Sequence, residues 1–547
     1  MQNSMMHMPL VIGSLADHAE RFHTATEVVS VETTGEVTRT SWGAVIGNAR
    51  RLASALEMHG VMQGDRCGTI AWNTRRHLEI YFGVSGGGMV CHTLNPRLSA
   101  EQLVYIVNDA RDRVLFIDRG FVATIAGLID QMPTVKMVVM MGARDEALAA
   151  QLDGMLFYDE LIANGDVAHK WPKIDETEPS SLCYTSGTTG HPKGVLYTHR
   201  STLLHTLAGN SPDGLGLSAR DTVMPAVPMF HVNAWGIPYI AAAVGAKLVL
   251  PGPKLDGESL ARLISSEKVT LALGVPTVWL GLLQGLEATG ADVSCLKRAM
   301  VGGTALPPSM IAEFRDKHGV DLVHIWGMTE TSPLGTVNQL LQKHVELPPE
   351  EQAERRLAQG RPPFGVQLRL VDSAGHVLPH DGVTQGELQI RGHWVVDTYY
   401  NKDRSALTFD GWFDTGDIAT IDPDGYMVIR DRSKDIIKSG GEWISTVELE
   451  NIAIAHPAVV NAAAIAARHP KWDERPVVIV QRHLRMEVSE EEILACYKGK
   501  VPNWQIPDRV IFIDNLPLGA TGKVVKARLR ELYGEVLMPE EEAAEAV

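Results

Sequence analysis

The chain has 547 residues, of which 45% are hydrophobic and 21% charged, proportions that exclude an intrinsically disordered protein. Its formal net charge of −16 argues against nucleic acid as a partner, because phosphate backbones are bound by basic surfaces. The chain shows no basic segment leading into an apolar one near its start, and its apolar stretch at 237–250 is too short to span a bilayer, so we expect a cytoplasmic protein without stable membrane insertion.

Helical and strand patterns alternate in the first part of the chain. Ser41 precedes a run whose apolar residues recur at spacings of four and three, which predicts a capped helix. Residues 67–72 and 113–118 have the composition of buried strands, and a second helix is predicted after Ser99. Such alternation favours parallel strands connected by helices.

Residues 184–195, YTSGTTGHPKGV, contain a run of glycines and hydroxyl side chains between two predicted strands, 181–185 and 195–198. Glycine lets backbone N–H groups approach a ligand closely, and hydroxyl groups add donors, so the pattern is typical of an anion-binding loop. It is not a Walker A loop, because the glycines have the wrong spacing from Lys193 and Gly194 occupies the Ser or Thr position. A flexible surface loop is the alternative that this stretch alone leaves open.

The second half of the chain changes character twice. From about Gly365, short apolar runs separated by Asp-Gly turns predict a compact antiparallel subdomain. Further on, two Ser-x-x-Glu capping boxes, which begin at Ser445 and Ser489, predict helices around two strands and hence a small α+β domain. The predicted fold is therefore α/β, with a large N-terminal domain (1–433) of αβ-layered subdomains plus an antiparallel β subdomain, and a small C-terminal α+β domain (434–547).

Five further segments contain chemistry-bearing residues at defined spacings. They are MVGGTALP (300–307), IWGMTETSP (325–333), GWFDTGD (411–417), IRDRSKDIIKSGGEWIS (429–445) and PLGATGK (517–523). In content and order, these segments and the glycine-rich loop resemble the acyl-adenylate-forming superfamily, which includes acyl-CoA synthetases, adenylation domains of peptide synthetases and beetle luciferases. The resemblance extends over nearly the whole chain.

The resemblance implies ATP-dependent adenylation of a carboxylic acid and transfer of the acyl group to CoA, with release of AMP and pyrophosphate. Mg²⁺ would lie between Thr185 and Glu330, which supply oxygen ligands. Lys523 would bridge the substrate carboxylate and the α-phosphate, and His231 would lie beside the adenylate. The implied catalytic residues are thus Lys523, Glu330, Thr185 and His231.

A larger set of residues is implied to bind ATP and AMP. The loop would hold the β- and γ-phosphates, Thr329 the α-phosphate, Trp326 the adenine ring, and Asp417 with Arg432 the ribose. The implied set is Thr185, Ser186, Gly187, Thr188, Thr189, Lys193, Gly302, Gly303, Thr304, Trp326, Gly327, Met328, Thr329, Asp417, Arg432 and Lys523.

By the same resemblance, the C-terminal domain is mobile and swings about a hinge at Lys434 between two catalytic poses. In one pose Lys523 faces the nucleotide, and in the other a CoA-binding segment does. The implied CoA-binding residues are Lys438, Ser439, Gly440, Gly441, Glu442 and Trp443, and the implied acyl-pocket residues are His231, Val232, Trp235, Gly302 and Gly303. A homodimer is expected.

The acid to be activated is less closely defined. The bulk of Trp235 favours a short or medium acyl chain, although rotation of the indole would open a longer cavity. Residues 8–23, 228–239 and 469–480 are most similar to ligases that act on 3-methylmercaptopropionate, with medium- and long-chain fatty-acid-CoA ligases as the alternative. A luciferase-like monooxygenase and an inactive binding protein are further alternatives.

Overall fold

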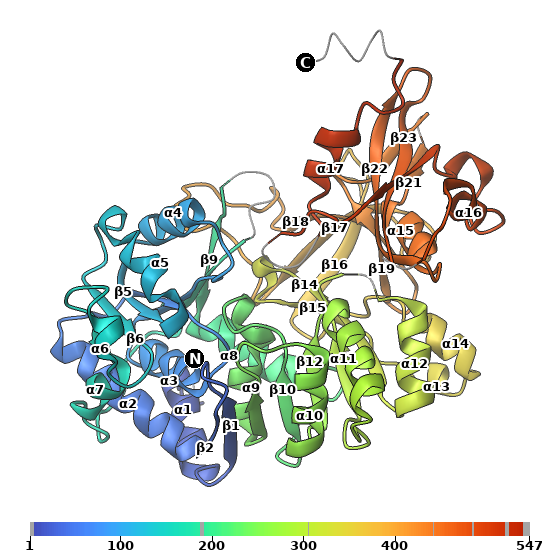
Figure 1. Ribbon diagram of the computed structural model, residues 1–547. Helices are drawn as coiled ribbons and strands as arrows, with labels where there is room; N and C mark the ends of the chain where they lie inside the picture. The colour runs from blue at the N-terminus through green and yellow to red at the C-terminus, as the bar shows by residue number, and fades with distance from the viewer. Residues whose placement is uncertain are drawn as a thin grey trace.

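The computed structural model describes residues 5–185, 191–304, 306–440, 442–483, 486–519 and 524–539, which form four β-sheets with helices around them (Figure 1). In Figure 1 the two large sheets and their helices make up the lower part of the molecule, and the C-terminal strands and helices form a smaller lobe above them. The predicted α/β class, with a large N-terminal part and a small C-terminal part, is confirmed.

The seven-stranded sheet has the strand order β7-β6-β5-β3-β4-β8-β9. Neighbours from β7 to β8 pair in parallel, and β9 pairs antiparallel with β8. Its strands are β3 (Arg66–Ile70), β4 (Val90–Thr93), β5 (Asp112–Ile117), β6 (Met137–Met140), β7 (Leu156–Phe157), β8 (Pro179–Tyr184) and β9 (Gly194–Thr198). Helices in this part of the chain are α1 (Ile12–Phe22), α2 (Trp42–Met58), α3 (Arg75–Gly86), α4 (Ala100–Ala110), α5 (Val122–Ala126), α6 (Glu146–Ala149) and α7 (Tyr158–Ala163).

The eight-stranded sheet has the order β15-β14-β13-β12-β10-β11-β1-β2, parallel from β14 to β1 and antiparallel at both edges. Its strands are β1 (Glu27–Val31), β2 (Val37–Ser41), β10 (Thr222–Pro225), β11 (Lys247–Leu250), β12 (Leu271–Gly274), β13 (Arg298–Val301), β14 (Asp321–Gly327) and β15 (Leu334–Val337). The accompanying helices are α8 (His199–Gly209), η3 (Val232–Gly236), α9 (Ile237–Val244), α10 (Gly257–Glu267), α11 (Pro276–Thr289), α12 (Pro308–His318), η4 (Thr329–Thr331), α13 (Gln342–Val345) and α14 (Pro349–Arg355).

Two smaller sheets come later along the chain. The antiparallel sheet predicted after Gly365 comprises β16 (Val366–Val371), β17 (Gly386–Gly392), β18 (Phe413–Ile421) and β19 (Met427–Arg432). The C-terminal sheet has the order β21-β20-β23-β22, with β24 beside β23. Its elements are β20 (Ile437–Ser439), β21 (Glu442–Ile444), α15 (Thr446–Ile454), β22 (Val459–His469), β23 (Asp473–Arg482), α16 (Glu490–Ala495), β24 (Arg509–Ile513) and α17 (Lys526–Tyr533).

Predicted helix starts agree with the observed caps. The Ser41 side chain accepts the Ala44 N–H at the start of α2, and Ser99 forms a reciprocal capping box with Gln102 at the start of α4. Ser489 caps α16 in the same way. These hydroxyls satisfy N–H groups that the first helical turn leaves without a partner, so the helices begin where the sequence predicts.

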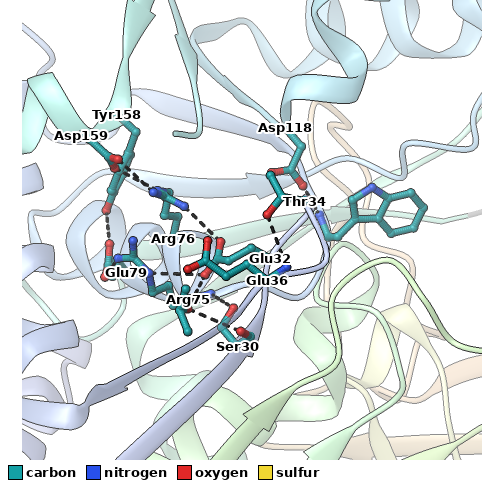
Figure 2. A network of polar contacts seen from close by, with 12 residues as sticks. Ser30, Glu32, Thr34, Glu36, Arg75, Arg76, Glu79, Asp118, Tyr158 and Asp159 are labelled. Atoms are coloured by element: carbon teal, nitrogen blue, oxygen red, sulfur yellow. Dashed lines mark hydrogen bonds and ion pairs between the residues drawn. The ribbon is translucent and has the colours of Figure 1, made fainter. Parts of the chain in front are cut away.

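A network of ion pairs joins the two large sheets (Figure 2). Arg76 on α3 pairs with Glu32 after β1 at 3.0 Å and with Asp159 on α7 at 2.9 Å. Arg75 pairs with Glu32 at 3.4 Å and with the fully buried Glu79 at 3.2 Å. A buried charge is tolerated when it is paired, so these contacts fix α3 against β1 and hold the sheets in one arrangement.

A buried apolar cluster also connects the two sheets, because it includes residues of α1, α2, α3 and α9 together with strands of both. Burial of this apolar surface stabilises their packing. Within the described ranges, no helix is long and apolar enough to cross a membrane.

Candidate active site

The base of the predicted phosphate loop is a β-hairpin. Tyr184 at the end of β8 pairs with Gly194 at the start of β9. One residue further into the loop, the Thr185 N–H donates to the Lys193 carbonyl at 2.9 Å, and the Lys193 N–H donates to Thr185 Oγ1 at 3.1 Å. The hairpin therefore brings Thr185 and Lys193 together. The predicted loop residues Ser186, Gly187, Thr188 and Thr189 lie outside the described residues.

Glu330 lies near this loop, at the carboxyl end of β14. Its side chain is buried, and its Oε1 accepts a hydrogen bond of 2.8 Å from the Tyr399 hydroxyl. The Tyr399 ring in turn lies 4.8 Å from Lys193 Nζ, within the range of a cation–π contact. Burial and the adjacent carboxylate raise the pKa of Tyr399, which keeps its proton on the hydrogen bond. Tyr399 thus contacts both Lys193 and Glu330 and connects them.

The rest of the WGMTE segment is held by close packing. The Tyr197 hydroxyl donates to the Thr329 carbonyl at 2.7 Å. Trp326 is buried, and a methyl group on Gly335 would lie 2.3 Å from its Cζ3, so Gly335 lets the indole pack flat on β15. Gly327 and Met328 come directly after Trp326. Stacking of Trp326 on adenine remains a prediction.

Asp417 and Arg432 form a pair across two strands. They are register partners on β18 and β19, and Arg432 Nε lies 2.8 Å from Asp417 Oδ1. The Asp417 side chain is buried, whereas the Arg432 side chain is 44% exposed. The ion pair orients the Asp417 carboxylate, whose oxygens are hydrogen-bond acceptors, the role that its predicted ribose contact requires.

The segment around the predicted hinge connects two sheets. β19 ends at Arg432 and β20 begins at Ile437, so Lys434 lies in the turn between them. Its hinge role, and the predicted boundary between 433 and 434, remain predictions.

A polar cluster spans this turn. The carboxylate of Asp431, before Lys434, accepts the Thr446 N–H at the start of α15 and the Thr446 hydroxyl at 3.0 Å. Lys526 on α17 donates to Thr446 Oγ1 at 2.6 Å and pairs with the half-buried Glu450 at 2.6 Å. A carboxylate on β19 thus caps α15, on the other side of the predicted boundary.

The predicted CoA segment forms the β20–β21 hairpin. Its Lys438 side chain is exposed, while its N–H donates to Glu474 at 2.7 Å. Ser439 is buried and bonded to Arg475, and Trp443, which follows Glu442, is 40% exposed. Gly440 has φ of +60° and packs against Trp472. Gly441 and the predicted catalytic Lys523 lie outside the described residues.

The predicted acyl-pocket residues lie in two segments, which follow β10 and β13. Residues 232–236 form a turn with left-handed backbone, which comes after His231 and is called the left-handed turn below. A methyl group on Gly302, just after β13, would lie 3.2 Å from Trp235 Cη2, so the indole and this glycine are neighbours. Gly303 and Thr304 are exposed, and Val232 is buried. His231 is half-buried, and its contact with an adenylate remains a prediction.

Most of these residues follow the carboxyl ends of parallel strands: β8, β10, β13 and β14. Ligands of open α/β sheets bind at that edge. A separate crevice contains Arg75, Arg76, Arg119 and Arg144, but each of these arginines is already paired with a carboxylate, so this crevice offers no free cation for a triphosphate.

Sequence reasoning missed Tyr399, the residues Asn73 and Tyr81 that contact the segment 228–239, and Asn233 within that segment. Tyr399 lies 69 residues from Glu330 and outside every motif. Asn233 stands inside the segment 228–239, but its partners are on β8 and α3. No local pattern indicates such partners; the fold alone brings them together.

Comparison with known proteins identifies the family of the chain. Residues 15–400 match the AMP-binding enzyme family, and residues 448–523 match the AMP-binding enzyme C-terminal domain. The chain is 59% identical over 537 residues to the 3-methylmercaptopropionyl-CoA ligase of Ruegeria lacuscaerulensis, covering 98% of this chain and 100% of that protein. It is 56% identical over 538 residues to the medium-chain-fatty-acid–CoA ligase of Ectopseudomonas oleovorans, covering 98% of each.

Among solved structures, that of the anthranilate CoA ligase AuaEII in complex with anthranoyl-AMP resembles the chain with a TM-score of 0.86 and 25% identity, over 100% of both chains. The predicted superfamily is confirmed. From its two family matches and its full-length relatives, the chain belongs to the AMP-binding enzyme family.

Proposed function

We propose that the protein activates a short or medium carboxylic acid with ATP, holds it as acyl-AMP and transfers the acyl group to CoA, releasing AMP and pyrophosphate. The observation that carries the proposal is the contact of the phosphate-loop base with Glu330 through Lys193 and Tyr399. In-line attack by a carboxylate on the α-phosphorus brings two anions together, so it requires positive charge and fixed oxygen ligands at that point.

Mg²⁺ fits this site by the chemistry of its donors. Thr185 and Glu330 offer oxygen atoms, and the Tyr399 hydroxyl orients the Glu330 carboxylate at 2.8 Å. When bound, the ion would neutralise phosphate charge. The chain's own contribution is to hold the carboxylate buried and oriented.

For the acid, we favour 3-methylmercaptopropionate, with a medium- or long-chain fatty acid as the alternative. Support comes from relatives named for the first acid at 59% and 57% identity, and from a medium-chain ligase at 56%. A thioether is nearly as apolar as a methylene, and one methylene is worth only about 1–3 kcal/mol, so overlapping specificity is expected.

The test is CoA-dependent AMP release with propionate, 3-methylmercaptopropionate, hexanoate, decanoate and palmitate. A maximum at 3-methylmercaptopropionate or hexanoate supports the proposal, and a maximum at palmitate overturns the preferred acid. Production of ADP and phosphate in place of AMP and pyrophosphate would overturn the reaction itself. Light emission with an aryl acid and oxygen would favour the luciferase-like alternative.

The Lys523 role can be tested separately. We expect Lys523→Ala to lower acid-dependent pyrophosphate exchange by about a hundredfold or more, because one electrostatic catalyst is lost. Supplied acyl-AMP should still be converted to the thioester at a near-normal rate. Equal losses in both assays would show that Lys523 serves another purpose. A cytoplasmic location and a homodimer are also proposed, the latter to be checked by light scattering.

A further inference from the structure

The left-handed turn has a backbone that its sequence does not favour. Val232, Asn233, Ala234 and Trp235 have φ of 42°, 54°, 48° and 57°, and Gly236 has φ of 79°. In this conformation Cβ approaches the following carbonyl oxygen, so residues other than glycine adopt it singly and not in a row. Contacts from outside the turn must therefore hold it.

Asn233 makes such contacts. It is buried, its Nδ2 donates to Ser181 Oγ on β8 at 3.0 Å, and its Oδ1 accepts from the Tyr81 hydroxyl on α3 at 3.2 Å. Cys183 Sγ, also on β8, lies 3.6 Å from the same Oδ1. Asparagine is one of the few residues that tolerates a left-handed backbone. The Asn233 side chain thus ties the turn to β8 and α3.

The chain leading into the turn has its own contacts: the Tyr81 hydroxyl donates to the Met229 carbonyl, and Asn73 makes three further hydrogen bonds. Asn73 Nδ2 donates to the carbonyls of Pro225 and Val227, both at 2.9 Å, and Asn73 Oδ1 accepts the Met229 N–H at 2.7 Å. Because residues 225–229 already have these bonds, the Asn233 contacts act on the turn itself and on the side chains that the turn carries.

The Trp235 indole, which the turn carries, lies beside Gly302. A methyl group on Gly302 would come within 3.2 Å of Trp235 Cη2, and one on Gly236 within 2.8 Å of His205 Cε1, so the ring lies close to Gly302 and the turn lies close to His205. A change in the backbone of the turn would therefore move the indole relative to Gly302.

We propose that Asn233 is a specificity-determining positioning residue, whose amide holds the left-handed turn and thereby keeps the Trp235 ring beside Gly302, where the ring limits acyl-chain length. This role rests on the proposed function, since an acyl chain has to enter between these residues. Asn233 itself does not contact the reacting atoms.

The test compares Asn233→Gly, which keeps the left-handed backbone accessible and removes the amide contacts, with the parent enzyme. The readout is the ratio of kcat/KM for 3-methylmercaptopropionate to that for decanoate. We expect the ratio to fall by about tenfold, the discrimination that a few methylene contacts supply. The KM for ATP should stay unchanged, because the phosphate loop is not touched. Ser181→Ala, which removes the acceptor of the Asn233 amide, should shift the ratio in the same direction.

Asn338→Gly is the matched control. Asn338 is also buried, and its amide donates to two backbone carbonyls, those of Arg355 and Ala358, far along the chain from the turn. It should lower thermal stability without changing the ratio. In a Trp235→Ala background, Asn233→Gly should have no further effect on the ratio. An unchanged ratio in Asn233→Gly, or the same change in Asn338→Gly, overturns the proposal.

A second measurement does not depend on turnover. The emission of Trp235 is obtained by subtracting the spectrum of Trp235→Phe from that of its parent, and its quenching by acrylamide reports how well the ring is held. We expect stronger quenching in Asn233→Gly than in the parent. If the parent releases no AMP with any acid, the proposed function is wrong. If quenching in Asn233→Gly equals that in the parent, Asn233 does not position the ring.

Discussion

Tyr399 illustrates how much of the candidate site depends on a single side chain. Its hydroxyl orients Glu330 and its ring contacts the Lys193 ammonium, so it connects the predicted metal ligand to the predicted phosphate loop. A ligand whose orientation is fixed before the ion arrives binds it more tightly, because less freedom is lost on binding.

Tyr399→Phe should therefore weaken the response to Mg²⁺. Loss of an outer partner of a metal ligand costs about 10- to 100-fold in metal affinity or activity, and we expect a change of that size. The measurement is the Mg²⁺ concentration that gives half-maximal AMP release at saturating ATP. Tyr400→Phe is the control, since its hydroxyl donates to the Ala110 carbonyl and not to Glu330. Identical Mg²⁺ dependence in the two variants would contradict the orienting role.

Asp118 at the end of β5 predicts a pH effect on stability. Burial raises the pKa of Asp118 to about 7, although its side chain accepts the Trp72 N–H at 2.8 Å. The folded state then retains a proton that the unfolded state releases near pH 4. As the pH rises from 4 to 7, the contribution of this group to the free energy of unfolding therefore falls, by at most about 1.4 kcal/mol per pH unit.

Asp118→Asn removes this titration and keeps the acceptor. The melting temperature of the variant, relative to the parent, should rise from pH 5 to pH 8. The same difference at both pH values would show that Asp118 is ionised in the folded protein across the range.

At the scale of elements, local pattern predicts helices and strands well but not the left-handed turn. The caps at Ser41, Ser99 and Ser489 are local contacts, and the pairing of Thr185 with Lys193 results from one hairpin. The turn contradicts local preference, because a β-branched valine and a tryptophan adopt left-handed backbone there. Its partner Ser181 lies 52 residues away, so only tertiary packing reveals it.

A comparison of two alanines tests whether the turn stores strain. Ala234 in the turn and Ala241 in α9 are both fully buried, so their replacement by glycine removes the same buried methyl group. Glycine relieves a left-handed backbone but weakens a right-handed helix. Ala234→Gly should therefore be less destabilising than Ala241→Gly, by about 1 to 2 kcal/mol. Chemical denaturation measures the difference, and equal losses would mean that the turn carries no strain.

At the scale of the whole molecule, the order of motifs predicts a large and a small part, and the fold shows how they touch. The sequence indicates Lys434 as a hinge, but it does not reveal that Asp431, three residues earlier, caps α15 and lies in one cluster with Thr446 and Lys526. These contacts cross the predicted hinge, so they depend on the placement of both parts, which no motif encodes.

Asp431→Asn should loosen the attachment of the small part. With a spin label on each part and no substrate present, the distribution of distances between labels should become broader than in the parent. Asp435→Asn is the control, because Asp435 pairs with Arg530 at 2.7 Å and both come after Lys434 in the chain. Equally narrow distributions in all three proteins would show that the cap does not restrain the hinge.

The helix cap contributed by Asp431 has a consequence for energy coupling. Before any substrate binds, the possible arrangements of the large and small parts differ in free energy. The arrangement in which Asp431 caps α15 is favoured, because it gains the two hydrogen bonds with Thr446. If Lys434 is the pivot, a ligand shifts the protein to another arrangement only when it binds that arrangement more tightly, by at least the free-energy difference between the two arrangements. The apparent affinity of such a ligand is reduced by the same difference.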